Sequence, residues 1–332
     1  MTQTNLSRRG LLGALALAPA ALAMPALLGS TRALAQAPSA TAPTGGITRH
    51  RIGDIEVIAL SDGFGSVPTG ILVGLEEGAA QQAAALAHKP HDANNMNIAI
   101  NAYLIRSQGR VIAVDSGAGS AMGPTLGAWQ NSLSLAGIAL EDIDTMFLTH
   151  THTDHVGGLT DAAGNRMLPN AQLVAAEAEW FFAHDEGVFS SVPEEFKGNF
   201  LASRALLAPY ADGRTMLAMD RETEIAPGIT AVPMPGHTPG HMGLRVASND
   251  SAALIWGDII HAPAYQFSHP DWSVAFDADI PTAIATRQRL LDMVASDDTM
   301  VAGMHLDFPA FGYVERRSDA YRYTAAAPDF GA

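Results

Sequence analysis

The chain of 332 residues has no cysteine, and its only lysines are Lys89 and Lys197. Without cysteine there can be no disulfide and no cysteine-ligated metal site, so the fold must depend on its core and on other ligands. The shortage of lysine leaves little material for a basic patch. With 19 basic and 34 acidic side chains the formal net charge is −15, which repels polyanions, so we expect no nucleic-acid partner.

Several catalytic signatures are also missing from the chain. The sequence contains no nucleophile-elbow serine, no phosphate-binding glycine loop and no dinucleotide-binding fingerprint. Apolar residues make up 48% of the chain and charged residues 16%, which is typical of a globular protein with a sizeable core. Its chemistry must therefore come from side chains of another kind.

The first 35 residues are predicted to be a targeting segment. Residues 7–12 read Ser-Arg-Arg-Gly-Leu-Leu, which resembles a bacterial twin-arginine export signal, and an apolar stretch follows. Residues 33–35, Ala-Leu-Ala, supply the small-x-small pattern that a signal peptidase cleaves. A membrane anchor is the alternative, but two prolines within the stretch favour a removed signal. We therefore expect a periplasmic or secreted protein with no membrane association after signal removal.

Residues 36–46, rich in alanine, proline and glycine, are predicted to be a flexible linker. Residues 47–325 are predicted to form one catalytic domain and residues 326–332 a C-terminal tail. Two rounds of short apolar strands followed by helices predict an α/β fold, an αββα four-layer sandwich with two sheets face to face. The expected strands are 55–60, 102–105, 110–114, 145–148, 173–175, 229–233, 242–246, 252–256 and, last, 299–302. The expected helices are 76–88, 124–136, 178–183, 194–207 and 281–294.

The strongest local signal is a cluster of metal-binding residue types directly after the strand at 145–148. The cluster reads His150-Thr-His152-Thr-Asp154-His155. Imidazole nitrogen suits zinc and similar divalent ions, and a carboxylate adds an anionic ligand. Alternate residues of an extended segment point the same way, so His150 and His152 can bind one ion while Asp154 and His155 face a second.

Three further candidate ligands follow predicted strands. They are His237 in a loop rich in proline and glycine, Asp258 after Trp256-Gly257, and His305 after Gly303-Met304. Taken singly, each histidine could be an ordinary hydrogen-bonded residue, and Asp258 could be a helix N-cap. If all four strand ends meet at one edge of the two sheets, the seven side chains form a two-metal centre. Such a centre acidifies a shared water to hydroxide near neutral pH.

The remaining histidines and the aromatic residues carry weaker expectations. His241 could support a ligand by hydrogen bonding or be purely structural, and His261 and His269 could line a pocket. His50, His88, His91 and His184 are expected at the surface. Eight aromatic residues could form an apolar wall around a substrate or fill the core: Phe64, Trp180, Phe181, Phe182, Phe196, Tyr265, Phe267 and Phe308.

At these residues the chain resembles the metallo-β-lactamase-fold superfamily, and within it the methyl parathion hydrolases and their lactonase relatives. Supporting stretches lie at residues 53–63, 115–118, 123–127, 257–267 and 305–309. The resemblance implies the αββα sandwich, two divalent ions, most plausibly Zn²⁺, and a homodimer. It assigns one ion to His150, His152 and His237, and the other to Asp154, His155 and His305. In the same assignment Asp258 bridges the two ions.

The expected activity is metal-dependent hydrolysis of a small, uncharged, ester-like molecule: a lactone, an aryl ester or an organophosphate triester. Asp258 bridges the ions in this mechanism, and Asp154 is the candidate for carrying a proton to the leaving oxygen. An acyl-homoserine lactonase is the alternative within the hydrolases. An iron-dependent redox enzyme on the same scaffold is the alternative from another class.

Overall fold

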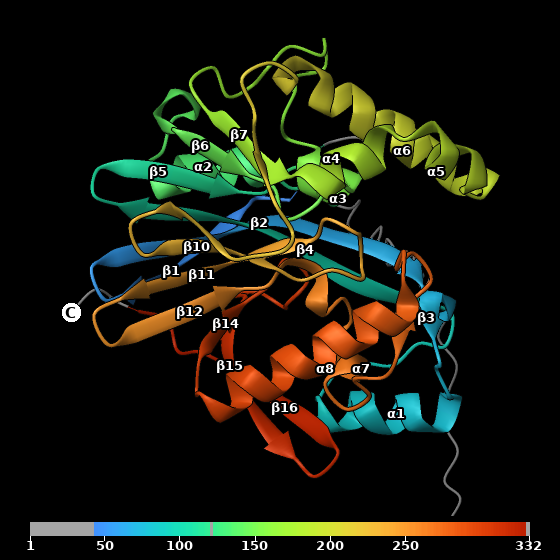
Figure 1. Cartoon of the computed structure of the whole chain (residues 1–332). Coiled ribbons are helices and arrows are strands. Elements are labelled where there is room, and N and C mark those ends of the chain that lie inside the picture. The colour runs from blue at the N-terminus through green and yellow to red at the C-terminus, as the bar shows by residue number, and fades with distance from the viewer. Residues whose placement is uncertain (1–42, 120–121, 330–332) are drawn as a thin grey trace, which may run out of the picture. The chain divides into compact units, whose positions relative to one another are not determined.

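The computed structural model describes residues 43–119 and 122–329, and two seven-stranded sheets dominate this part of the chain (Figure 1). The first sheet has the order β1-β2-β4-β5-β6-β7-β8 and the second β16-β15-β14-β12-β11-β10-β9. The strands of the first sheet are β1 (Gly46–Ile52), β2 (Ile55–Pro68), β4 (Asn95–Ser107), β5 (Arg110–Val114), β6 (Thr145–Phe147), β7 (Gln172–Ala176) and β8 (Thr215–Leu217). Those of the second are β9 (Thr223–Ala226), β10 (Ile229–Pro233), β11 (Met242–Ser248), β12 (Ser251–Ile255), β14 (Met300–Ala302), β15 (Phe311–Arg317) and β16 (Ala320–Ala325). A small third sheet pairs β3 (Leu72–Val73) with β13 (Ser273–Val274).

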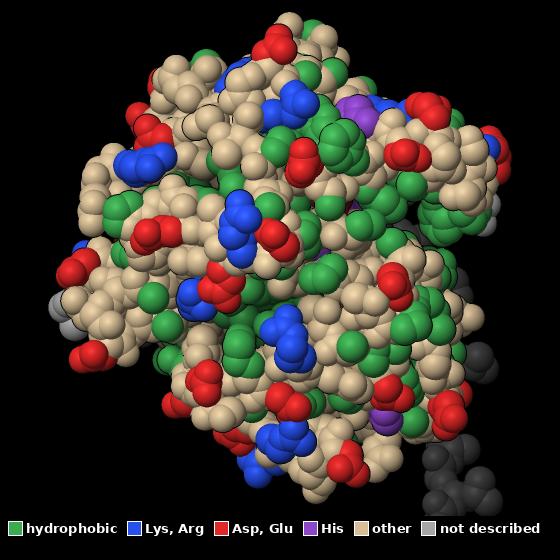
Figure 2. Space-filling model, viewed as in Figure 1, with side chains coloured by type: hydrophobic (Ala, Val, Ile, Leu, Met, Phe, Trp, Pro, Cys, Tyr) green, Lys and Arg blue, Asp and Glu red, His purple; other side chains and the backbone are tan. Residues whose placement is uncertain are grey.

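Helices cover the outer face of each sheet, so the predicted αββα four-layer sandwich is confirmed (Figure 1). Helix α2 and the α4–α6 group lie outside the first sheet, and α8 lies outside the second. The helices are α1 (Glu77–Leu86), α2 (Trp129–Ala136), α3 (Thr153–Val156), α4 (Glu177–His184), α5 (Glu186–Ser191), α6 (Glu194–Leu207), α7 (Pro263–Gln266) and α8 (Ile280–Ser296). Hydrophobic side chains are exposed over α4–α6 (Figure 2). Phe181 of α4 and Leu201 of α6 are among the exposed large hydrophobic residues.

Strand β2 shows why the sandwich buries both faces of its sheets. Val57 and Ala59 point into the core between the sheets, whereas Ile58 and Leu60 pack in the core beneath the outer helices. Alternate side chains of a strand point to opposite faces, and here both faces are apolar and fully buried. The sheet is therefore a middle layer.

Several sequence-based boundaries were wrong, and three of them have a clear physical cause. The strand at 299–302 is not the last, because the β15–β16 hairpin follows and extends the same sheet. The linker ends before Gly46, whose N–H donates to the Ser132 hydroxyl at the start of β1. The helix predicted at 124–136 begins only at Trp129, because the Asp62 carboxylate accepts the N–H groups of Gly127 and Trp129 and caps the helix there.

The predicted signal peptide at 1–35 lies outside the described residues, as does most of the predicted linker. Within the described ranges, no helix is long and apolar enough to cross a bilayer.

Candidate metal centre

Polar side chains follow four strand ends at one edge of the two sheets. His150 comes after β6, His237 lies in the loop between β10 and β11, Asp258 follows β12, and His305 follows β14. The first of these strands belongs to one sheet and the other three to its partner sheet. The structure brings all seven sequence-predicted ligands together at this edge.

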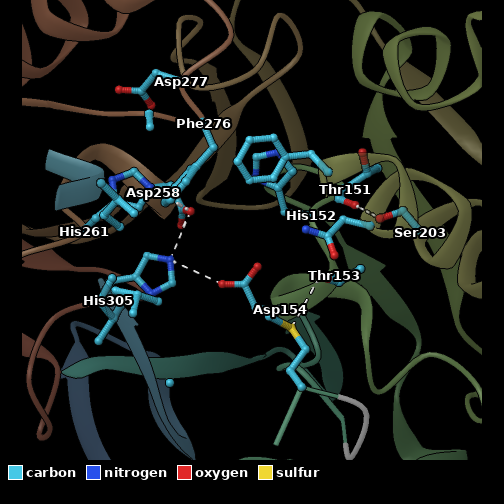
Figure 3. Close-up of a pocket in the computed structure, with 18 of the residues that line it drawn as sticks. Thr151, His152, Thr153, Asp154, Ser203, Asp258, His261, Phe276, Asp277 and His305 are labelled. Atoms are coloured by element: carbon cyan, nitrogen blue, oxygen red, sulfur yellow. Dashed lines mark hydrogen bonds and ion pairs between the residues drawn. The ribbon is translucent and has the colours of Figure 1, made fainter. Parts of the chain in front are cut away.

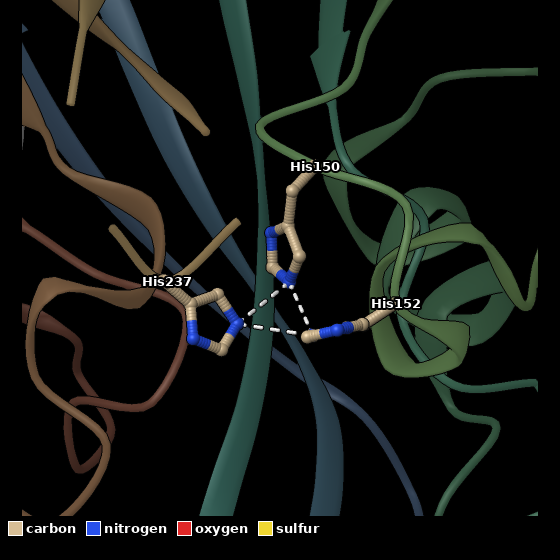
Figure 4. A group of neighbouring side chains, drawn as sticks. All are labelled: His150, His152 and His237. Carbon is tan, nitrogen blue, oxygen red and sulfur yellow. Dashed lines mark hydrogen bonds between the residues drawn. The ribbon is translucent and has the colours of Figure 1, made fainter. Parts of the chain in front are cut away.

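His150, His152 and His237, here called the first triad, present three ring nitrogens to one another (Figure 4). The Nε2 atom of His150 lies 3.0 Å from Nδ1 of His152 and 3.2 Å from Nε2 of His237. The His152 and His237 nitrogens are 3.0 Å apart. Lone pairs that converge so closely suit a shared proton or a cation bound by three nitrogens.

Asp154, His155 and His305, here called the second triad, form an adjoining group. Asp154 Oδ2 lies 3.5 Å from His155 Nε2 and 3.6 Å from His305 Nε2. Figure 3 shows Asp154, Asp258 and His305 pointing toward one another. This set offers two nitrogens and one oxygen, a donor combination that also suits zinc.

Asp258 lies between the two triads. Its Oδ2 atom is 3.6 Å from Nε2 of His150 and 3.3 Å from Nε2 of His237 on one side. On the other side it is 3.3 Å from Nε2 of His155 and 3.0 Å from Nε2 of His305. One carboxylate oxygen within reach of both groups is the arrangement that a bridging ligand requires.

Carboxylates that the sequence reasoning did not single out orient two of these histidines. Asp115 Oδ2 lies 2.7 Å from His155 Nδ1, and Asp277 Oδ1 lies 2.7 Å from His237 Nδ1. Metal-binding histidines usually donate their second N–H in this way, which fixes the tautomer and the ring orientation. Asp115 directly follows β5 with a φ of 59°, and the Thr149 N–H and hydroxyl both donate to it. The position of Asp115 directly after a buried strand was a signal available in the sequence. No such signal marked Asp277.

Strand β4 holds the loop that carries His305. The Asn101 amide donates to the carbonyls of Met304 and Leu306 at 3.0 and 2.8 Å. The Tyr103 hydroxyl donates to the Gly303 carbonyl at 2.9 Å and also lies 2.8 Å from the Gly303 N–H. His305 Nδ1 is 2.9 Å from the Ala99 carbonyl. The first sheet therefore positions a ligand that belongs to the second.

The weaker histidine expectations had mixed outcomes. His241 supports the centre, because its Nδ1 faces the Met234 carbonyl and its Nε2 accepts the Asp258 N–H at 3.0 Å. His261 lines the cavity beside the centre, with Nε2 3.2 Å from Asp258 Oδ2. His269 instead stacks on Trp272. The surface expectation for His50 was wrong, because its ring is buried against Phe311.

The pKa shifts separate the two triads. Burial lowers the pKa of His152 to about 3, helped by His237, and also holds the pKa of His150 well below its usual value. Burial opposes protonation of His155 too, but the negative charges of Asp258, Asp154 and Asp115 outweigh it and hold the pKa of His155 well above normal. The pKa of His305 is raised by Asp258 in the same way. His150 and His152 are thus neutral, while His155 and His305 retain protons more readily.

The donor set fits divalent cations. Oδ1 of Asp258 and Nδ1 of His261 are buried and have no hydrogen-bond partner among the described residues. A buried polar atom without a partner is costly unless a ligand satisfies it. The two triads and Asp258 provide nitrogen and oxygen donors at the spacing that two adjacent ions need.

A cavity of about 550 Å³ opens onto Asp154 and His305 of the second triad, and onto His152 and Asp258. Of the eight candidate wall aromatics, only Phe182 and Phe196 line it, and the lining also includes Phe200 and Phe276, which the sequence reasoning missed. Tyr265 and Phe267 are buried away from the cavity, and Trp180 packs on His184 and Arg214. The positions of the aromatic residues in the sequence could not distinguish those that line the cavity from those that pack elsewhere.

A sandwich with two clusters of histidine and aspartate at one sheet edge is the architecture of a metal-dependent hydrolase. The family model described as the metallo-beta-lactamase superfamily matches residues 97–305, and the chain belongs to this superfamily. The superfamily match and the lactonase relatives support a metal-dependent hydrolase.

Lactonases stand among the relatives. The chain is 23% identical over 171 residues to an N-acyl homoserine lactonase from a Bacillus species, and 26% identical over 170 residues to N-acyl homoserine lactonase AiiB from Agrobacterium fabrum. These matches cover 52% and 46% of this chain, and they span only 59% of each relative's length.

Two solved structures resemble the chain over most of its length. Hydrolase AbOPH of the beta lactamase superfamily has a TM-score of 0.79 and 25% identity, with 86% of this chain and 98% of that chain covered. The dizinc quorum-quenching lactonase AidC has the same TM-score and coverage at 22% identity, which shows the shared fold. The likeness to methyl parathion hydrolase stays a prediction.

Proposed function

We propose that the protein is a two-metal hydrolase of uncharged, ester-like molecules with an apolar substituent, above all lactones and aryl esters. The observation that carries this proposal is the character of the cavity beside the two triads. Its lining includes Val67, Ile98, Phe196, Phe200 and Phe276, and no lysine or arginine lies among the lining residues. A substrate with a carboxylate or phosphate group would find no counter-ion in this wall, whereas an apolar chain would be desolvated there.

The proposal assigns one divalent cation, most plausibly zinc, to each triad and gives Asp258 the bridging position. Such a pair supplies Lewis acidity and a water acidified to hydroxide. Asp277 and Asp115 hold the imidazoles of His237 and His155 in the required orientation. The side chain of Asp154 is 19% exposed and lines the cavity, against 2% for Asp258, so Asp154 can carry a proton to the leaving oxygen.

The experiment is a hydrolysis screen of the full zinc-loaded chain. We expect γ-lactones with long alkyl chains, dihydrocoumarin and aryl esters to be hydrolysed, a phosphotriester more slowly, and a carboxylate-bearing β-lactam least of all. Treatment with a chelator should abolish the activity, and zinc should restore it. Full activity after chelation, or a preference for the β-lactam, would contradict the proposal.

A matched pair of variants tests the apolar wall. Phe196 lines the cavity from α6, whereas Phe181 on α4 is 63% exposed and is not part of the lining. Phe196→Ala should raise KM for long-chain lactones about tenfold, because part of the substituent stays in water. Phe181→Ala should leave KM unchanged. Equal effects from both variants would show that the cavity wall does not bind the apolar substituent of the substrate.

An acyl-homoserine lactonase is the second candidate, and the two lactonase relatives favour it. Comparing homoserine lactones that bear long acyl chains with simple alkyl lactones separates a requirement for the acylated amine from a preference for any apolar lactone. Metal analysis of protein from its native compartment tests the redox alternative, since iron with oxygen uptake would contradict a hydrolytic zinc pair.

We further propose export through the twin-arginine segment and a homodimeric assembly. The support for export is the Arg8-Arg9 pair and the small-x-small pattern before residue 36. The homodimer is what the resemblance to the superfamily implies. Replacing both arginines with lysine should retain the protein in the cytoplasm, as cell fractionation would show. Sedimentation of the mature chain would report a single subunit if the dimer assignment is wrong.

A further inference from the structure

Glu179 is a fully buried carboxylate that the mechanism above does not use. It lies in the first turn of α4, and its hydrogen bonds go to residues other than the seven candidate ligands. Its two oxygens accept four hydrogen bonds. Oε1 accepts the Thr151 N–H at 2.9 Å and the Thr151 hydroxyl at 2.8 Å. Oε2 accepts the Thr238 hydroxyl at 2.5 Å and the Gly240 N–H at 3.2 Å.

These four donors belong to the two loops that build the first triad. Thr151 stands between His150 and His152, in the loop that leaves β6 of the first sheet. Thr238 follows His237 directly, in the loop between β10 and β11 of the second sheet. One side chain therefore binds both loops and fixes their separation. The distances among the three ring nitrogens depend on that separation.

The packing at Gly240 reinforces the connection. A Cβ atom on Gly240 would lie 2.2 Å from the Glu179 backbone nitrogen and 2.5 Å from its Cα. Only a bare backbone can approach α4 this closely, so the loop that carries His237 lies directly against the helix. Small lateral movements of the loop are blocked as well.

The hydrogen bonds also define the charge of Glu179. All four partners donate, and burial raises the pKa of this carboxyl while the hydrogen bonds from Thr238 and Thr151 oppose that rise. An ionised carboxylate satisfies the four donors without adding another one. The first triad consists of three imidazoles and contains no carboxylate of its own, so a negative charge held behind its loops favours a cation there.

We propose that Glu179 is a positioning residue that sets the cation affinity of the first triad by holding its two loops at a fixed distance. This inference rests on the assignment of metal ions in the proposed function. It predicts a selective effect: the first triad depends on Glu179 and the second does not, because His155 and His305 are held by Asp115 and β4.

The test is Glu179→Gln in the full chain, with zinc binding measured by competition titration in the absence of substrate. Glutamine keeps the size of the side chain but turns an NH₂ group toward donors. We expect one of two zinc equivalents to bind about 10–100-fold more weakly and the other to be unchanged. Unchanged binding of both equivalents, or equal weakening of both, would overturn the inference.

Two background variants identify which triad is affected. In a His305→Ala background, which retains the first triad, Glu179→Gln should weaken the remaining equivalent. In a His152→Ala background, which retains the second triad, the same change should have no effect. A general loss of structure would weaken both backgrounds, and that result would contradict a positioning role. A chain that binds no zinc at all would instead refute the proposed function.

Thr238 provides a milder variant if Glu179→Gln does not fold. Thr238→Val removes one hydroxyl donor and keeps the shape, so we expect a smaller weakening of the same equivalent, about threefold to tenfold. Thr238→Ser keeps the hydroxyl and should therefore bind zinc with the wild-type affinity. If Thr238→Val and Thr238→Ser bind zinc identically, the Glu179 contact does not control the first triad.

Discussion

The two triads share Asp258 but differ in charge and in support. The first is built from imidazoles alone, on loops that Glu179 and Asp277 bind from outside. The second contains its own carboxylate, Asp154, and lies against β4 and Asp115. The difference shows that one centre can combine two imidazoles that stay neutral, His150 and His152, with two that must release protons before they bind a cation, His155 and His305.

The largest effect on zinc binding and activity should come from a substitution of Asp258, because this residue lies beside both triads and its loss should affect them equally. Asp258→Asn removes the charge of the one oxygen that lies within 3.6 Å of histidines from both triads. We expect both zinc equivalents to be weakened and kcat/KM for lactones to fall by at least about 10³-fold. Metal content after dialysis and steady-state kinetics check this. If one equivalent stayed at wild-type affinity, Asp258 would belong to a single triad.

A pair of carboxylate variants should separate the triads next. Asp277→Asn should weaken zinc at the first triad about 10–100-fold, because His237 loses the partner that orients it. Asp115→Asn should do the same at the second triad through His155. Competition titrations in His305→Ala and His152→Ala backgrounds report each site separately. If Asp277→Asn weakened zinc binding at the second triad, the two triads would not have separate supporting carboxylates.

The pH dependence of zinc binding should also differ between the two triads. Only neutral imidazole binds a metal ion, and the pKa values of His155 and His305 are raised whereas that of His152 is lowered to about 3. As the pH falls from 8 to 6, affinity at the second triad should fall, by up to about tenfold per pH unit for each proton displaced. Affinity at the first triad should fall less, because the pKa values of His150 and His152 are lowered. Titrations in buffers of different ionisation enthalpy would detect the released protons.

The raised and the lowered pKa values have opposite effects on the stability of the metal-free protein. The raised pKa values of His155 and His305 contribute stability that is fully present below pH 6.5 and lost as the pH rises through them. The lowered pKa of His152 destabilises the fold as the pH falls from 6.5 toward about 3, since the unfolded chain then binds the extra proton. Urea denaturation of metal-free protein from pH 4 to pH 9 would show both slopes, and His152→Ala should remove part of the acidic one.

Much of the sandwich was predictable because its central strands are short and apolar on both faces. The strands β5 and β10 and the helix α6 have the predicted bounds. The β15–β16 hairpin was missed because β15 ends in the exposed, charged residues Glu315-Arg316-Arg317, so its apolar residues form no continuous run. The start of α2 was missed because a distant residue, Asp62, decides it.

The candidate ligands were predictable for a different reason. Histidine and aspartate directly after buried strands are conspicuous, and parallel or neighbouring strands bring their ends to one edge. The supporting residues could not be found in this way. Glu179 and Asp277 stand in a helix and a loop with no motif, and their roles depend on contacts across 28 to 59 positions of sequence. Such partners follow from packing, which one sequence does not reveal.

The smallest predicted difference concerns the hydrogen bonds that anchor each triad's loop. Asn101→Ala removes the donor to the Met304 and Leu306 carbonyls that flank His305, so the metal-free protein should lose about 2–3 kcal/mol of unfolding free energy. Ser203→Ala removes one 2.7 Å bond to the Thr151 carbonyl and should cost about 1 kcal/mol, because Glu179 still holds that loop. Chemical denaturation ranks the two variants. A larger loss for Ser203→Ala would mean that the first triad's loop depends on α6 rather than on the carboxylate of α4.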